Sequence, residues 1–104
     1  DLTQYTMAAD RGNRQVGYLN DVFEPAVLRA IRYIIKCAGD AGIPVGMCGE
    51  AAADPRLTPL LISFGLDEFS VSPSSVLRTR YNCGPGRKQI KLLQRSWIWR
   101  QQMI

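Results

Sequence analysis

The sequence has no histidine among its 104 residues. This absence excludes from the chain itself every mechanism that needs an imidazole, whether a Ser-His-Asp triad or a phosphohistidine. Long apolar runs are also lacking, since stretches such as residues 60–62 end far short of the roughly 20 residues that cross a bilayer. We therefore expect no membrane span. No secretory leader is visible, and the opening Asp1 leads us to expect a piece of a longer protein.

Cysteine is scarce, and acidic residues are missing from the end of the chain. Cys37, Cys48 and Cys83 cannot all pair, and they show neither the spacing of a zinc site nor the density of a secreted disulfide scaffold. They predict reduced thiols and a cytoplasmic protein. All nine acidic residues lie at or before Glu68, whereas seven of the 13 basic residues follow it. The net charge of +4 is therefore an average over two unlike parts.

The clearest predicted element is an amphipathic helix that begins at Pro25. Its apolar positions recur at helical spacing and are Val27, Leu28, Ile31, Ile34, Ile35 and Ala38. Arg29, Arg32 and Lys36 fall on the opposite face. Proline suits the first turn of a helix, and Gly42 is suited to end it.

Short helices and strands alternate after this helix. We predict a buried strand at 44–48, a loop at 49–54, a helix at 55–64 with Pro59 in its first turn, a strand at 68–71, and a helix capped at 72–75 that runs through Arg80. Such alternation is typical of a parallel sheet in an α/β fold. A complete (β/α)8 TIM barrel needs eight strands and roughly 250 residues. This chain could supply only the last strands and helices of one, so we expect a fragment.

Cys48 is the first candidate for chemistry, because reactive groups in parallel α/β folds gather where strands end. Gly49 after it permits close approach of a ligand, and Glu50 is near enough in sequence to influence the thiol. A free cysteine is also commonly a small buried apolar residue. The pattern alone leaves both interpretations open and favours the second.

The opening segment carries a second candidate group. Asp1, Asp10 and Arg11 fit a site for a magnesium-bound anion, since a carboxylate binds the hard cation and arginine binds phosphate or carboxylate through two hydrogen bonds. An acid and an arginine in a loop also fit a solvated surface pair, and the residues alone favour that second interpretation.

Three stretches carry a family resemblance: DLTQYTMAADRGN from Asp1, VGMCGEAAADP from Val45 and GLDEFSVSPSSVLR from Gly65. In order and spacing they resemble the C-terminal barrel of Enzyme I of the bacterial sugar phosphotransferase system, the phosphoenolpyruvate-protein phosphotransferases. The resemblance covers residues 1–80 and implies the phosphoenolpyruvate-binding type of TIM barrel. Pyruvate-phosphate dikinases and phosphoenolpyruvate synthases share the first and second themes, so a fragment of either is an alternative.

The resemblance implies roles for individual residues. Asp1 matches an aspartate that helps to coordinate Mg²⁺, and Arg11 matches an arginine that contacts phosphoenolpyruvate. Cys48 matches the acid that protonates the enolate carbon after phosphate has left, a role for which a thiol is chemically suited. Glu50, together with Ser70 or Ser72 at the next strand end, is our conjecture for orienting that thiol.

The resemblance also implies partners. The family transfers phosphate to a histidine of its own N-terminal domain and then to the carrier HPr for sugar uptake, and its barrel domain forms homodimers. This chain contains no such histidine, and the family's asparagine before Asp1, its glutamate metal ligand and further phosphate-binding residues are not found in it. We therefore expect the isolated chain to have no measurable turnover.

The resemblance fails after Arg80. Residues 81–104 form a basic tail with Trp97 and Trp99, whereas the family continues with an acid-rich helical region. A nucleic-acid-binding or membrane-surface tail is one interpretation, because clustered bases attract phosphate and tryptophan can stack on bases. A non-native or frameshifted end without selected function is the other. We favour the second and do not expect nucleic acid as a partner.

Overall fold

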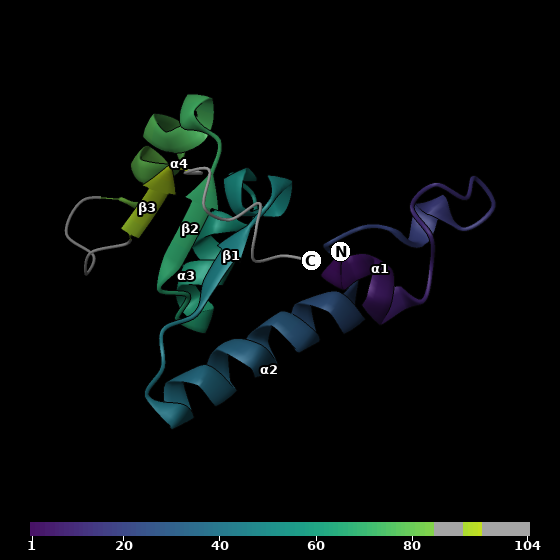
Figure 1. Cartoon of the computed structure of the whole chain (residues 1–104), viewed down its shortest axis with the longest axis horizontal. Helices are drawn as coiled ribbons and strands as arrows, with labels where there is room; N and C mark the ends of the chain where they lie inside the picture. The colour runs from purple at the N-terminus through teal and green to yellow at the C-terminus, as the bar shows by residue number, and fades with distance from the viewer. Residues whose placement is uncertain (85–90, 95–104) are drawn as a thin grey trace.

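The computed structural model describes residues 1–84 and the backbone of residues 91–94 of this chain. In chain order the elements are α1 (Leu2–Met7), η1 (Gly17–Leu19), α2 (Pro25–Ala41), β1 (Gly46–Cys48), η2 (Glu50–Ala53), α3 (Thr58–Phe64), β2 (Glu68–Val71), η3 (Pro73–Ser75), α4 (Val76–Cys83) and β3 (Lys91–Gln94). Figure 1 shows the strands together, with the long helix α2 running below them toward α1 and the N-terminus. Helices and strands alternate along the chain, as the sequence predicts for an α/β protein.

The strands form one parallel sheet in the order β1-β2-β3. Cys48 at the end of β1 is in register with Ser70 of β2, and Ser70 is in register with Leu93 of β3. The third strand was not predicted, and it lies within the segment interpreted as a basic tail. The described residues contain three strands, and these form an open sheet and not a closed barrel.

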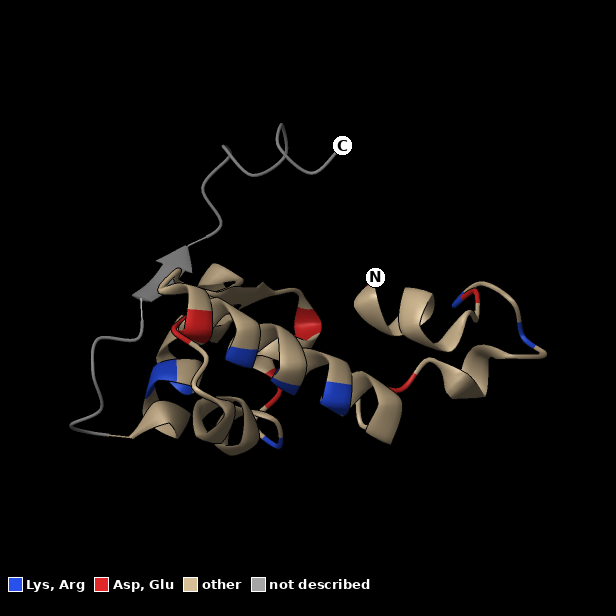
Figure 2. Ribbon diagram, turned by 90° about the horizontal axis from the view of Figure 1, so that it is seen from below, with Lys and Arg blue, Asp and Glu red and all other residues tan. Residues whose placement is uncertain are grey.

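Helix α2 confirms the strongest prediction from the sequence. It begins at Pro25 and is followed by Gly42 in the left-handed conformation, at φ +68°. Its buried side chains are Val27, Ile31, Ile35 and Ala38. The basic residues lie on the other side of the helix, where Figure 2 shows them spaced along it. A single helix thus separates an apolar face from a solvated one.

The core joins α2 to the sheet and to α3. Phe69 of β2 and Leu57 and Leu61 at α3 are fully buried, and they belong to one cluster with the apolar face of α2. Burial alternates along β2, where Phe69 and Val71 are buried and Glu68 and Ser70 are half-buried. This alternation is expected of a strand with one covered face, because successive side chains point to opposite sides.

Several predictions of detail were wrong. The opening segment was treated as a loop, yet it contains α1, which buries none of its residues and therefore leaves no apolar period to detect. Strand β1 was predicted to be buried, but Gly46 and Cys48 are exposed. The cap predicted at 72–75 is correctly placed, since Ser75 precedes α4, but its hydroxyl makes no cap hydrogen bond, residues 73–75 form the turn η3, and α4 runs past Arg80 to Cys83.

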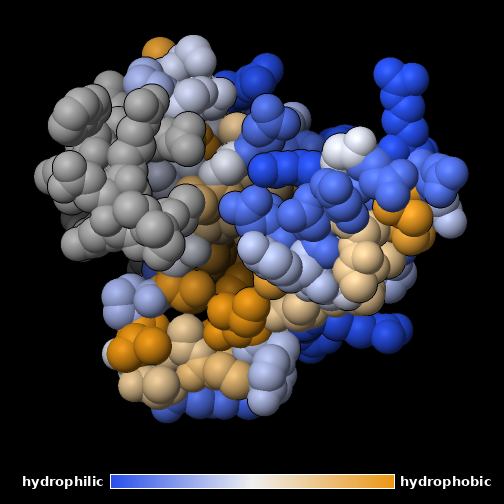
Figure 3. Space-filling view, turned by 45° about the vertical axis from the view of Figure 1, so that its right-hand side comes forward, coloured by the Kyte–Doolittle hydropathy of each residue, from blue (hydrophilic) through white to orange (hydrophobic). Residues whose placement is uncertain are grey.

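Apolar side chains remain at the surface. Among the exposed ones are Ile34 on α2 and Ile43 just after it, at 45% and 59% relative exposure. Figure 3 shows apolar side chains reaching the surface over part of one face, between hydrophilic regions. No helix within the described part of the chain is long and apolar enough to cross a membrane.

Candidate functional site

Cys48 lies at the carboxyl end of β1, as the sequence predicts. Its thiol is exposed, which contradicts the alternative that it is a small buried residue. Its register partner across the parallel ladder is Ser70, which is half-buried. Residues in register on neighbouring strands project from the same face, so the thiol and the hydroxyl share one side of the sheet. Met47 and Phe69 occupy the opposite side, toward the core.

The backbone turns sharply just after the cysteine. Gly49 has φ +87°, a conformation that strongly favours glycine, and an added Cβ there would meet no atom within 4 Å. Glu50 then opens η2 and is exposed. The space beside Gly49 is therefore open. The carboxylate of Glu50 has no hydrogen bond to Cys48 within the described residues, so its orienting role stays a prediction.

Ser72, the other candidate for orienting the thiol, follows the end of β2. Its Oγ lies 3.1 Å from the Oγ of Ser75 and 3.2 Å from that of Ser74. These contacts form a small hydroxyl cluster on the turn into α4. The geometry places Ser70 next to Cys48 in the sheet but ties Ser72 to its own turn.

The opening candidates also come together in space. Arg11 Nη1 lies 3.6 Å from Asp1 Oδ1, and both side chains are largely exposed. The loop that carries Arg11 is fixed by Gln4, whose Oε1 accepts a hydrogen bond from the Arg11 amide at 3.0 Å. Asp10, in contrast, accepts a bond from the Gly12 amide and serves the turn itself. The arginine and the first aspartate therefore form one exposed pair of opposite charges.

These two groups of candidates are separate in this structure. Among the described residues, no hydrogen bond or ion pair joins Asp1 or Arg11 to Cys48, and Figures 1 and 2 both show the loop after α1 extending away from the sheet. Within the described part of the chain, no three His, Cys, Asp or Glu side chains are placed to hold a metal ion. Asp1 alone does not make a magnesium site, so the residues described here do not fit the ion without further ligands.

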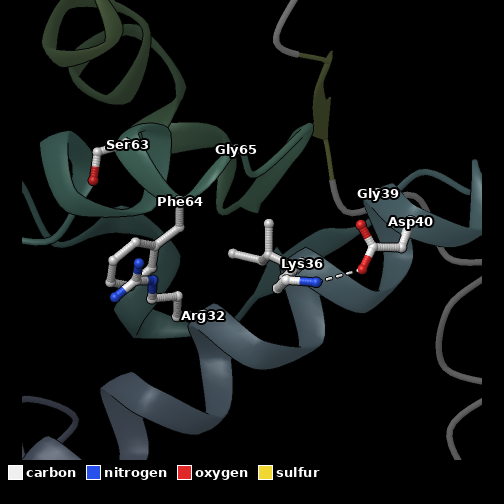
Figure 4. Close-up of a pocket in the computed structure, with 8 residues that line it drawn as sticks. Arg32, Lys36, Gly39, Asp40, Ser63, Phe64 and Gly65 are labelled. Atoms are coloured by element: carbon white, nitrogen blue, oxygen red, sulfur yellow. Dashed lines mark hydrogen bonds and ion pairs between the residues drawn. The ribbon is translucent and has the colours of Figure 1, made fainter.

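A surface groove lies near the amino ends of the strands, opposite to the end that carries Cys48. It has a volume of about 530 Å³ and is lined by Arg32, Ile35, Lys36, Gly39, Asp40, Ser63, Phe64 and Gly65. Figure 4 shows it between α2 and α3, with Lys36 directed at Asp40. Both helices end there and lead into the amino ends of β1 and β2. Catalytic groups in parallel α/β folds gather at the carboxyl ends, so this groove is not the candidate site.

A cluster in the segment that follows β1 and η2 was not predicted from the sequence. Asp54, just after η2, accepts hydrogen bonds from Arg56 Nε at 3.1 Å and Nη2 at 2.8 Å. The hydrogen bond from the Arg56 side chain is the main cause that lowers the pKa of Asp54. Arg56 Cζ also lies 4.6 Å from the centroid of the Phe23 ring. The contact joins residues that are far apart in the sequence, and no local spacing predicts it.

Comparison with known proteins identifies the family of this chain. The family model described as "PEP-utilising enzyme, PEP-binding domain" matches residues 1–85. The chain belongs to this family. Phosphoenolpyruvate-protein phosphotransferases from Streptococcus equinus and Latilactobacillus sakei are 58% and 55% identical to it over 80 residues, which is 77% of this chain. The match to the same enzyme of Geobacillus stearothermophilus is 50% identical over 96 residues, or 92% of the chain.

The family assignment confirms the resemblance seen in the sequence and defines its extent. The chain spans 14 to 15% of the length of these relatives. The Geobacillus match also includes part of residues 81–104, although the interpretation of that segment as a non-native or frameshifted tail stays a prediction. This PEP-binding family member thus carries the strand edge with Cys48 and the exposed Asp1–Arg11 pair, but only a small share of its relatives' chain.

Proposed function

We propose that this chain forms the end of the phosphoenolpyruvate-binding barrel of a phosphoenolpyruvate-protein phosphotransferase. The observation that carries the proposal is the exposed Cys48 at the carboxyl end of a parallel strand, in register with Ser70, within residues that match the PEP-binding family. The exposed face of β1 supports a larger (β/α)8 barrel, because the remaining strands of such a barrel would cover it. The curated relatives carry the phosphotransferase name, which favours this activity over the dikinase and synthase alternatives.

In the proposed reaction, Arg11 binds the anionic phosphoenolpyruvate and Cys48 donates a proton. The phosphorus–oxygen bond breaks as phosphate passes to a histidine outside this chain, and the enolate of pyruvate remains. The Cys48 S–H bond then breaks and a C–H bond forms at the enolate carbon, which leaves pyruvate and a thiolate that takes a proton from water. Mg²⁺, held by Asp1 and by ligands outside this chain, would stabilise negative charge on the substrate.

The proposal extends to partners that only the whole protein could serve. The phosphate acceptors would be the N-terminal histidine domain and then HPr, in a cytoplasmic homodimer. The isolated chain has no histidine, so we expect no turnover from it. Formation of pyruvate from phosphoenolpyruvate by the purified 104-residue chain and a separate phosphoacceptor domain would contradict this expectation.

A hybrid enzyme tests the function directly. Residues 1–80 of this chain would replace the matching segment of the Geobacillus stearothermophilus phosphotransferase, and pyruvate formation would be measured with HPr as acceptor. We expect an active hybrid in which Cys48→Ser lowers kcat by about 10² to 10⁴. Cys37→Ser is the matched control, because Cys37 is also an exposed thiol but lies on α2. An inactive hybrid, or equal effects of both substitutions, would refute the proposal.

A further inference from the structure

Two loops carry the proposed catalytic and substrate-binding residues, and a cation–π contact joins them. The loop after β1 begins at Cys48 and contains Asp54 and Arg56, whereas the loop after α1 carries Arg11 and ends at Phe23. Arg56 Cζ lies 4.6 Å from the Phe23 ring centroid, within the range of a cation–π contact. This contact crosses between segments more than 30 residues apart, as the residue numbers show.

Arg56 is held firmly on its own side. Its Nε, Nη2 and backbone amide all donate hydrogen bonds to the Asp54 carboxylate, at 3.1, 2.8 and 2.9 Å. The Asp54 carbonyl in turn accepts bonds from the amides of Leu57 and Thr58, both buried at the start of α3. The planar guanidinium is thus fixed in position before it meets the aromatic ring.

Phe23 links the Arg56 side chain to the loop that bears Arg11. Its amide donates a hydrogen bond to Asp21 Oδ1 at 2.9 Å, which fixes the turn before α2. Asn20 Nδ2, one residue earlier, donates a bond to the carbonyl of Ala9 at 2.8 Å. Ala9 is 2% exposed and stands two residues before Arg11. A continuous path of short contacts therefore runs from Arg56 to the base of the Arg11 loop.

We infer that Arg56, held by Asp54, is a positioning residue that fixes the Arg11 loop relative to the strand edge that bears Cys48. This inference rests on the proposed function for its enzymatic consequence. Within the described residues no hydrogen bond or ion pair joins Arg56 to Arg11 or Cys48, so it would act through Phe23 and the turn at Asp21. Loss of the contact would let the Arg11 loop move while Cys48, held by the β1–β2 ladder, stays in place.

Hydrogen exchange of the 104-residue chain tests the structural half of the inference. Arg56→Ala should raise exchange at the amides of residues 9–22 while leaving the interior of α2 unchanged, and Arg56→Lys should restore protection only partly because lysine lacks the planar fork. Lys36→Ala is the control, since it breaks the Lys36–Asp40 ion pair at the other edge of the sheet. Unchanged exchange at residues 9–22, or the same rise in the control, would overturn the inference.

Kinetics of the hybrid enzyme test the functional half. Arg56→Ala should raise KM for phosphoenolpyruvate by about fivefold and change kcat by less than about twofold, because it loosens substrate binding without touching the proton donor. Arg56→Lys should recover part of the lost affinity. An inactive parent hybrid would refute the proposed function, and the hydrogen-exchange experiment would still test whether the contact between Arg56 and Phe23 holds the Arg11 loop. An active hybrid whose KM is insensitive to Arg56→Ala would refute the positioning role alone.

Discussion

Two glycines at the end of α2 offer a test in which the same substitution, glycine to alanine, should change the free energy of unfolding in opposite directions. Gly39 lies inside the helix, whereas Gly42 follows it at φ +68°. A Cβ added at either position would meet no atom within 4 Å. Contact with neighbouring groups therefore cannot decide the effect of alanine, and only the backbone conformation differs between the two sites.

The expected magnitudes follow from that difference. Gly39→Ala should stabilise the fold by about 1 kcal/mol, because alanine loses less backbone entropy than glycine in a helix. Gly42→Ala should destabilise it by about 1 kcal/mol, because an L-residue is strained in the left-handed region. The conformation at Gly42 is required by the helix end, where its amide bonds to the Gly39 carbonyl at 3.1 Å and the Ile43 amide bonds to the Ala38 carbonyl at 3.0 Å.

Urea unfolding followed by far-UV circular dichroism would measure both variants. The two free energies of unfolding should differ by about 2 kcal/mol, with wild type between them and the slope against urea unchanged. Gly42→Asn is a useful third variant, since asparagine tolerates the left-handed region better than alanine. A stabilising Gly42→Ala, or equal effects at both positions, would refute the assignment of the helix end.

Three further predictions concern the core, pH and thiol access. Phe69→Ala should cost about 3 to 5 kcal/mol because Phe69 is fully buried, whereas Tyr81→Ala, at an 85% exposed residue, should change stability by less than about 0.5 kcal/mol, as urea unfolding would show. Because Arg56 lowers the pKa of Asp54, that carboxylate stabilises the fold above its ordinary pKa of 3.8 and loses this effect as pH falls through the folded pKa. Unfolding measured from pH 7 to about pH 2 should show that Asp54→Asn is less stable than wild type near pH 7 and that the difference disappears near pH 2. A difference that stays constant over this pH range would contradict the prediction. Cys48 should react with iodoacetamide faster in the folded chain than buried Cys83, as peptide mass spectrometry would report.

Elements whose signals are local were predictable from the sequence. Helix α2 combines a helical apolar period with Pro25 at its start and Gly42 at its end, and all three signals agree with the structure. Strand β2 has the predicted bounds because its apolar positions alternate toward one core. The exposure of β1 was not predictable. An apolar run indicates a strand that is buried in the complete fold, but it does not show whether the residues that bury it lie in the same chain.

The candidate site was predictable only in part, for a similar reason. The carboxyl end of β1 is visible in the sequence, so Cys48 could be placed there, and parallel pairing then brings Ser70 beside it. The ion pair between Asp1 and Arg11 depends on α1 turning the chain back, and α1 has no fully buried residue to reveal it. The contact between Arg56 and Phe23 depends on tertiary packing alone, which periodicity and spacing do not encode.

The arrangement of charged groups separates structural roles from the proposed catalytic one. Lys36 and Asp40 pair at the amino edge of the sheet, next to the groove that Figure 4 shows, and they stabilise the last turns of α2. Arg56 and Asp54 pair in the segment that follows the carboxyl end of β1, where Cys48 lies. Arg56 also contacts Phe23, at the end of the loop that bears Arg11. Both pairs are largely exposed on their basic partner, so neither is expected to contribute much to global stability. The effect expected from the second pair is therefore positional, and a substitution there should alter loop protection and substrate affinity more than the free energy of unfolding.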